Sequence, residues 1–141
     1  MLAPDLELLQ EAAREAGDIA LRHRSAGLEP WEKPGGAGPL TKADLEIDDM
    51  LRSTLGAARP DYGWLSEETP DSASRLDHER VFIVDPIDGT RAFIEGSAAF
   101  SHALAIVERG EVIAGVVYLP ALDRLYAAAK GSGAKLNGAA L

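Results

Sequence analysis

The stretch Val81-Phe82-Ile83-Val84-Asp85-Pro86-Ile87-Asp88-Gly89-Thr90 joins an apolar run to a turn that carries two carboxylates. Residues 81–84 are Val, Phe and Ile bounded by Pro and Gly, which predicts a buried β-strand. The end of that strand places Asp85 and Asp88 where the chain leaves a sheet. Asp-Pro-x-Asp-Gly is also ordinary turn chemistry, because Pro presets φ and Gly accepts positive φ. A structural turn and a functional site are therefore both open here.

A second pair of carboxylates, Glu67 and Glu68, follows another short apolar stretch, residues 62–65. Carboxylates that converge on one point repel one another unless a hard cation lies between them. Mg²⁺ is the usual cation when a phosphate is the substrate. Ser66-Glu67-Glu68-Thr69 alone is typical of a solvated loop, but the two acidic pairs together predict a metal site.

The composition is that of one soluble globular domain: 141 residues, of which 46% are apolar and 26% charged. The absence of cysteine excludes disulfides and thiolate metal sites and is typical of a reducing cytoplasm. The sequence contains neither an apolar run of membrane-spanning length nor a signal-peptide pattern. A net charge of −9 disfavours a nucleic-acid polymer as partner. We therefore expect a cytoplasmic protein that binds neither a membrane nor a nucleic-acid polymer.

Helical periodicity predicts two helices in the first half of the chain. The first is expected over residues 5–24, and the second opens with a capping box from Thr41 to Asp44 and ends before Pro60. The apolar side chains of the second helix available for burial are Leu45, Ile47, Leu51 and Leu55. Between the helices, the Gly/Pro-rich residues 30–39 predict a mobile loop without helix or central strand.

The second half of the chain predicts β-hairpins. Residues 103–107 and 112–119 are β-rich runs separated by a four-residue connection that contains Gly. A further strand is expected over residues 124–129, after a turn at residues 120–123. Helices followed by antiparallel hairpins give an α+β domain, with N-terminal helices packed on a mainly antiparallel sheet.

Three segments together resemble the inositol monophosphatase superfamily: Glu67-Glu68, Asp85-Pro86-Ile87-Asp88-Gly89-Thr90, and the upstream Leu40-Thr41-Lys42-Ala43-Asp44. Members of that superfamily are Mg²⁺-dependent, lithium-sensitive phosphomonoesterases. The similarity runs over nearly the whole chain, to residues 131–138. The resemblance implies the first half of a layered α/β/α/β/α fold, with residues 1–141 as the metal-binding N-terminal domain and the family's C-terminal domain absent.

The resemblance also implies a set of metal ligands. Glu67, Asp85 and the backbone carbonyl of Ile87 would hold the first metal, and Asp85 would bridge to a second that Asp88 also binds. Pro86 helps to fix the separation of the two Asp residues because its φ is locked. Two or three Mg²⁺ ions are expected, with Mn²⁺ as an alternative and Li⁺ as an inhibitor. Two such ions about 3.5–4 Å apart neutralise the phosphate, activate a water and stabilise the leaving oxygen.

The catalytic residues that the resemblance implies are Asp44, Thr90 and Glu67. Asp44 would accept the proton of Thr90, so that Thr90 can accept one from the attacking water. Asp44 also has a structural explanation as the acid of the capping box. A short helix starting at Thr90 would offer free N–H groups to phosphate, and Gly89 would allow its close approach. The expected substrate-binding residues are Ile87, Asp88, Gly89 and Thr90.

Other polar side chains receive supporting or structural roles. Glu68 is expected to support the ligands, and Lys33 matches a basic residue that some relatives carry near the metals, although Lys is also common on any surface. The three histidines, His23, His78 and His102, fall in no ligand spacing and are expected to be structural.

The expected function is a Mg²⁺-dependent phosphomonoesterase that hydrolyses a small soluble phosphate monoester with a metal-activated water. Residues 39–44 and Thr90-Arg91-Ala92-Phe93 resemble bacterial adenosine 3′,5′-bisphosphate phosphatases more than inositol monophosphatases. Histidinol phosphatases share Thr-Arg-Ala-Phe, so histidinol phosphate is an alternative substrate. A non-catalytic metal-binding or interaction fragment is the alternative class.

The resemblance leaves one ligand unaccounted for. In the family a further Asp, from a later Trp-Asp motif, completes the second metal, whereas Asp123 is the only Asp after Asp88 here. The 141-residue chain alone is therefore expected to be nearly inactive. Its apolar face is expected to be covered by a missing second domain or in a homo-oligomer.

Overall fold

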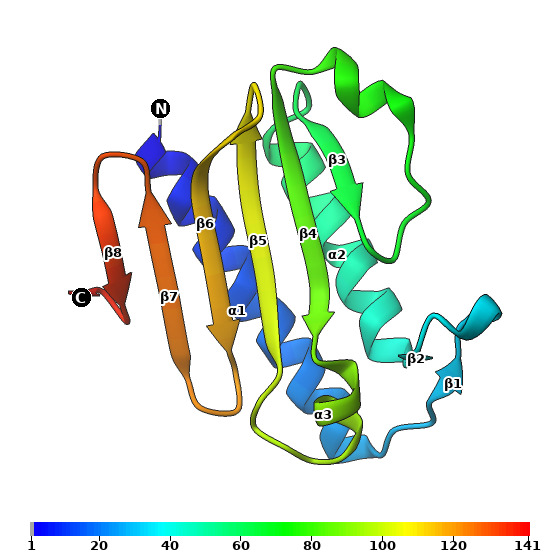
Figure 1. The fold of residues 1–141 in the computed structure, drawn as a ribbon. Helices are drawn as coiled ribbons and strands as arrows, with labels where there is room; N and C mark the ends of the chain where they lie inside the picture. Colours follow the sequence, from blue (N-terminus) through cyan, green and yellow to red (C-terminus); the bar gives the residue numbers. More distant parts are fainter. Residues whose placement is uncertain (1) are drawn as a thin grey trace.

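One mixed sheet with two long helices on a single face organises the chain (Figure 1). The computed structural model describes residues 2–141, and within them seven strands run in the order β3-β4-β5-β6-β7-β8-β9. They are β3 (Gly63–Ser66), β4 (Arg80–Asp88), β5 (Ser101–Glu108), β6 (Glu111–Leu119), β7 (Arg124–Ala129), β8 (Gly133–Leu136) and β9 (Ala139–Ala140). Only the β3–β4 pair is parallel among these described strands, so the predicted α+β class is confirmed.

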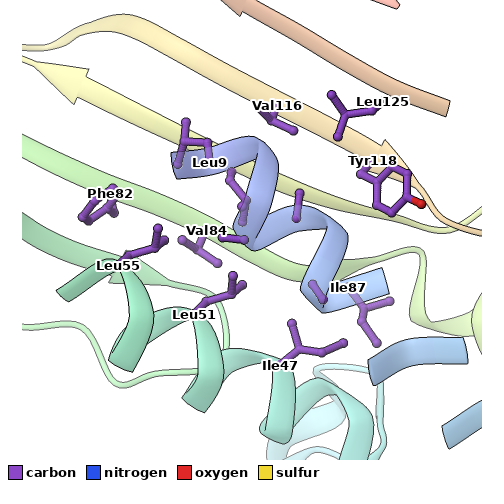
Figure 2. Close-up of a cluster of buried hydrophobic side chains, with 14 of the residues drawn as sticks. Leu9, Ile47, Leu51, Leu55, Phe82, Val84, Ile87, Val116, Tyr118 and Leu125 are labelled. Atoms are coloured by element: carbon purple, nitrogen blue, oxygen red, sulfur yellow. The ribbon is translucent and has the colours of Figure 1, made fainter. Parts of the chain in front are cut away.

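The helices α1 (Leu2–Ala26) and α2 (Lys42–Ala58) lie behind the sheet in Figure 1. The predicted capping box of α2 is present, with Thr41 as the N-cap and Asp44 as its acid. Ile47, Leu51 and Leu55 are fully buried against the sheet (Figure 2). The expected burial of Leu45 is wrong: this side chain is 40% exposed, because it lies on the opposite side of a helix with 3.6 residues per turn. No helix within residues 2–141 is long and apolar enough to cross a membrane.

Residues 30–39 contain more structure than their composition predicts. A small hairpin pairs β1 (Trp31–Glu32) with β2 (Pro39–Leu40), and a 3₁₀ turn, η1 (Pro34–Gly36), lies between them. The Lys33 N–H donates to the Gly38 carbonyl over 2.8 Å and closes the loop. The expectation of a loop without helix is therefore wrong for this turn, while the hairpin stays outside the main sheet as predicted. A second 3₁₀ turn, η2 (Ala73–Asp77), connects β3 to β4.

Strand β4 shows that the sheet has one covered and one open face. Phe82 and Val84 are 1% and 3% exposed and point toward the helices. Ile83 points to the other face and is 39% exposed, because successive strand residues alternate between faces. The prediction that residues 81–84 are buried is therefore wrong for Ile83. The open face carries an apolar hollow lined in part by Leu65, Ile83, Val117, Tyr126 and Ala128.

The hairpins follow the predicted order with one tighter turn. Glu108 and Glu111 pair with each other, so the β5–β6 connection is the two residues Arg109 and Gly110 rather than four. Both have positive φ, 49° and 81°, which suits a two-residue hairpin turn. The turn at residues 120–123 and the strand β7 lie where they were predicted.

Candidate active site

Parallel pairing brings the two predicted acidic segments together. Ser66 pairs with Val84, so Glu67 lies beside Asp85 at the carboxyl end of these parallel strands. The expectation that the chain leaves the sheet at Asp85 is wrong, because β4 continues to Asp88 and Asp85 still pairs with Ala103 of β5. The Glu67 N–H donates to the Val84 carbonyl over 3.2 Å, which extends the pairing by one residue. Asp88 ends β4 after an irregularity in the register between Asp85 and Asp88. The three predicted acidic ligands are thus neighbours at one edge of the sheet.

Asp85 is the electrostatically strained member of this group. Burial, together with the negative charges of Glu67 and Asp88, raises its pKa to about 7. Its Oδ1 atom is buried and accepts no hydrogen bond from the described residues. A charged carboxylate in such surroundings requires a positive partner, because leaving a buried acceptor unpaired costs free energy.

These features fit a hard divalent cation. All the predicted ligands are oxygen donors, and a cation would satisfy the orphaned oxygen of Asp85 while offsetting the like charges around it. Within residues 2–141 no three His, Cys, Asp or Glu side chains close around one point, so the group is an open arrangement. Mg²⁺ tolerates this because it keeps several waters. The ligand assignment to Glu67, Asp85, Asp88 and the Ile87 carbonyl stays a prediction.

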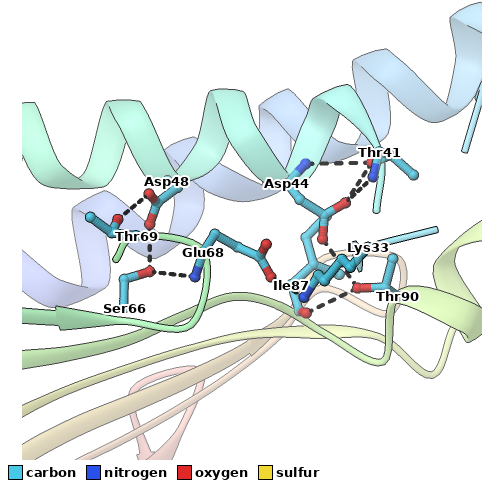
Figure 3. A network of polar contacts seen from close by, with 9 residues as sticks. All are labelled: Lys33, Thr41, Asp44, Asp48, Ser66, Glu68, Thr69, Ile87 and Thr90. Carbon is cyan, nitrogen blue, oxygen red and sulfur yellow. Dashed lines mark hydrogen bonds and ion pairs between the residues drawn. The ribbon is translucent and has the colours of Figure 1, made fainter. Parts of the chain in front are cut away.

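Asp44 links the capping box to the turn at residues 88–90 (Figure 3). It is 1% exposed, and its Oδ2 accepts from the Thr41 N–H over 2.9 Å and from the Thr41 hydroxyl over 2.6 Å. Its Oδ1 accepts from the Thr90 hydroxyl over 3.1 Å. The capping-box explanation of Asp44 is therefore confirmed, and the contact with Thr90 that the catalytic explanation requires is also present, while the catalytic role itself stays a prediction. Because a hydroxyl has one proton, donation to Asp44 leaves lone pairs of Thr90 available to a water.

Gly89 permits the tight entry into α3 (Thr90–Ile94), the short helix that was predicted at this point. Its φ of 84° lies in the left-handed region, and a Cβ there would stand 3.1 Å from the Ala99 carbonyl oxygen. The first N–H groups of any helix lack acceptors within the helix. The turn therefore presents backbone donors next to the acidic group.

Arg24, from the last turn of α1, clamps the far side of α3. Its guanidinium donates to the carbonyls of Phe93 and Ser97, each over 2.6 Å, and to Ala92 over 3.2 Å. It also lies over the rings of Phe93 and Phe100, 5.1 Å and 4.5 Å from their centroids. Burial lowers the pKa of Arg24. No sequence signal marked Arg24, because a basic residue in the last turn of a helix is commonplace.

Lys33 and Glu68 form an ion pair beside the acidic group. The Lys33 Nζ lies 2.7 Å from the Glu68 Oε1, and the two side chains are only 18% and 8% exposed. The hydrogen bond that Lys33 donates to Glu68 raises the pKa of Lys33, and burial raises the pKa of Glu68. The ion pair with Glu68 therefore holds the Lys33 ammonium group beside the acidic residues.

The histidines make structural contacts, as predicted. His102 is fully buried, and its Nδ1 lies 2.5 Å from the carbonyl oxygen of Pro86, in the acidic turn. Burial lowers its pKa to about 4, so it is neutral at physiological pH. His23 contacts Glu46, and His78 contacts the Asp61 carbonyl.

The whole sequence, residues 1–141, matches the Inositol monophosphatase family. The chain belongs to this family. The family is Mg²⁺-dependent. Membership accounts for the conjunction of the Glu67-Glu68 pair with the Asp85–Thr90 turn at one sheet edge.

Three family members illustrate the similarity. A histidinol-phosphatase from Chlorobaculum parvum is 37% identical over 97% of this chain and 52% of its own length. The 3′(2′),5′-bisphosphate nucleotidase CysQ from Salmonella typhimurium is 36% identical over 89% of this chain and 52% of its own. The solved structure of a Thermotoga maritima IMPase superposes with a TM-score of 0.87 at 33% identity, covering all of this chain and 53% of that one. The chain therefore spans about half the length of the curated relatives it matches.

Proposed function

We propose that residues 1–141 form the metal-binding half of a Mg²⁺-dependent phosphomonoesterase that acts on small soluble phosphate monoesters. The observation that carries this proposal is the uncompensated Asp85, beside Glu67 and Asp88, one turn from a Thr90 hydroxyl that Asp44 orients. A purely structural cluster would pair its buried acid within the chain.

The residues of the acidic group and the Asp44–Thr90 pair have different parts in the proposed reaction. Glu67, Asp85, Asp88 and the Ile87 carbonyl would hold Mg²⁺, which when bound supplies charge neutralisation and a water of lowered pKa. Asp44 accepts a hydrogen bond from the Thr90 hydroxyl, so that a Thr90 lone pair would be free to accept from the attacking water and orient it.

The phosphate would lie against the turn that follows Asp88. There the backbone N–H groups at Gly89 and Thr90 would donate to its oxygens. Arg24 keeps α3, and with it these donors, in place by binding its last carbonyls.

The substrate class is a small phosphate monoester. The resemblance of Thr90-Arg91-Ala92-Phe93 to nucleotide bisphosphate phosphatases supports adenosine 3′,5′-bisphosphate, and membership of the family supports an inositol monophosphate. Histidinol phosphate is the alternative, supported by the histidinol-phosphatase of Chlorobaculum parvum. We propose that residues outside 1–141 select among them, because the chain spans about half the length of these relatives.

Phosphate release tests the function. The protein carrying residues 1–141 is assayed on the three substrates, with Mg²⁺ and with a chelator, beside Asp85→Asn and its matched control Asp49→Asn, an exposed acid on α2. Activity that requires Mg²⁺, survives Asp49→Asn and is lost in Asp85→Asn supports the proposal. Release that is unaffected by the chelator or by Asp85→Asn contradicts it.

A further inference from the structure

Helix α2 presents two buried carboxylates to the edge of the sheet where the acidic group lies. Asp44 and Asp48 are 1% and 6% exposed. Residues four apart share one face of a helix, about 6 Å apart along its axis. Both side chains point from α2 toward the loops that follow β3 and β4 (Figure 3). Asp44 reaches Thr90, which follows β4. The contacts of Asp48 are with the other loop.

Asp48 bridges both ends of the segment that carries Glu67 and Glu68. Its Oδ1 accepts from the Ser66 hydroxyl over 2.5 Å, and its Oδ2 accepts from the Thr69 hydroxyl over 2.5 Å. The Ser66 oxygen in turn accepts from the Glu68 N–H over 3.3 Å. One carboxylate thus spans the four residues of this loop.

The chemistry of these contacts is that of a rigid support. Hydrogen bonds from a hydroxyl to a carboxylate are short and about twice as strong as neutral ones. The hydrogen-bond partners of Asp48 within the described residues are the two hydroxyl groups, so each carboxylate oxygen holds one end of residues 66–69 against α2.

We propose that Asp48 is a positioning residue for the metal site, which holds residues 66–69 against α2 so that Glu67 stays beside Asp85. The inference rests on the proposed function, because it takes Glu67 as a metal ligand. Asp44 and Asp48 then fix the two ligand-bearing loops from consecutive turns of one helix. Outer residues that orient metal ligands typically contribute 10–100-fold to metal affinity.

Isothermal titration calorimetry of the protein carrying residues 1–141 tests this inference. Mn²⁺ is the only ligand added, and its dissociation constant is the quantity measured. The variants are Asp48→Asn, the double variant Ser66→Ala with Thr69→Ala, Asp85→Asn, and the matched control Asp49→Asn. We expect Asp48→Asn to weaken Mn²⁺ binding about tenfold or more, and the double variant to weaken it to a similar extent. Asp49→Asn is expected to bind like wild type, because Asp49 is exposed on the same helix.

The outcomes separate this inference from the proposed function. Wild-type affinity in Asp48→Asn together with a loss in Asp85→Asn overturns the role of Asp48 and leaves the metal site standing. Wild-type affinity in Asp85→Asn overturns both. If Asp48→Asn does not fold, the double variant decides, because it removes the same two hydrogen bonds from the opposite side. A double variant that is less stable but binds Mn²⁺ normally shows that Asp48 only supports the fold.

Discussion

Two carboxylates near opposite ends of β4, the buried Asp5 and the half-buried Asp85, lie in opposite electrostatic settings. At its start, Asp5 of α1 is 2% exposed and accepts from Arg59 and from the Tyr62 hydroxyl, each over 2.8 Å, with Arg80 3.5 Å away. At its end, Asp85 is surrounded by Glu67 and further acids and keeps an orphaned oxygen.

The difference distinguishes a structural ion-pair cluster around Asp5 from a candidate metal site around Asp85. The Asp5 cluster is complete within the chain: it ties α1 to the segment after α2 and to β4, and nothing remains to be bound. The Asp85 cluster is incomplete by the same standard, because Lys33 pairs with Glu68 while the Oδ1 atom of Asp85 accepts no hydrogen bond from the described residues. A buried acid that the fold pairs indicates stability, and one that the fold leaves among like charges indicates an external cation.

The largest difference that we expect between the two clusters is in the rate of phosphate release. In the protein carrying residues 1–141, Asp85→Asn should lower phosphate release about 10²–10³-fold, because it removes a preorganised charge at the reacting centre. Arg59→Gln, in the other cluster, should leave turnover at 25 °C near wild type. Steady-state assays at saturating Mg²⁺ measure both, and comparable losses in the two variants would contradict the division of roles.

The length of the protein should have an effect of similar size. Residues 1–141 alone should turn over at least about 100-fold more slowly than the same sequence extended by a second domain, because one carboxylate of the second metal would be missing. Rapid Mg²⁺-dependent phosphate release by residues 1–141 alone would show that this half is sufficient.

Stability should respond in the other cluster. Asp5→Ala removes the acid that Arg59 and Arg80 share and should lower the free energy of unfolding by about 3 kcal/mol, because it leaves partly buried cations unpaired. The exposed Glu11→Ala on the same helix should change it by less than about 0.5 kcal/mol. Urea unfolding measures both free energies. Equally small changes in the two variants would show that the Asp5 cluster does not stabilise the fold.

A second stability prediction concerns Arg24, which supports the short helix α3 next to the candidate site. Arg24→Gln should lower the free energy of unfolding by about 2 kcal/mol, because carbonyls at the end of α3 lose a charged donor. Arg22→Gln, which removes an exposed pair with Glu46 from the same helix, should cost less than about 1 kcal/mol. Amide exchange of α3 should accelerate only in Arg24→Gln, and equal exchange in both variants would refute the clamp.

The smallest effect concerns the pH dependence of stability at His102. Its pKa of about 4 in the folded protein is below the unfolded value, so stability is present above about pH 6.5 and is lost as the pH falls toward 4. Between pH 7 and 5.5 this should remove about 1 kcal/mol. His102→Asn keeps a donor for the Pro86 carbonyl and does not titrate. Denaturant unfolding of wild type and His102→Asn gives the free energy of unfolding of each at every pH. The difference between the two proteins cancels the contribution of Asp85, which has the opposite sign. Identical slopes of this free energy against pH would contradict the burial of a neutral imidazole.

Local signals predicted the elements well, because their causes are local. The Thr41–Asp44 capping box and the Asp85–Thr90 turn depend on residues within a few positions of one another. Burial at single positions was harder to predict. Leu45 and Ile83 are apolar, but whether such a residue is covered depends on which face other elements pack against.

The assembly of the site depended on long-range pairing. The sequence indicated that Glu67 and Asp85 follow apolar strand segments, but only the parallel β3–β4 register shows that the two residues lie side by side. Arg24 contacts carbonyls about 70 residues later, and Asp48 reaches a loop about 20 residues later; neither contact has a motif. Resemblance to a family supplied roles for the motif residues and none for these supports.

The central claim, that Asp85 is held for an external cation, is tested most directly by thermal unfolding at pH 8 with and without Mg²⁺. At this pH the Asp85 carboxylate is charged, since its pKa is about 7. Without metal, Asp85→Asn should raise the unfolding midpoint by roughly 4 °C, because it relieves repulsion worth about 1 kcal/mol. With Mg²⁺ at 100 times its dissociation constant, wild type should gain about 2.7 kcal/mol and the variant far less. A variant that is destabilised without metal and gains as much from Mg²⁺ as wild type would contradict the account.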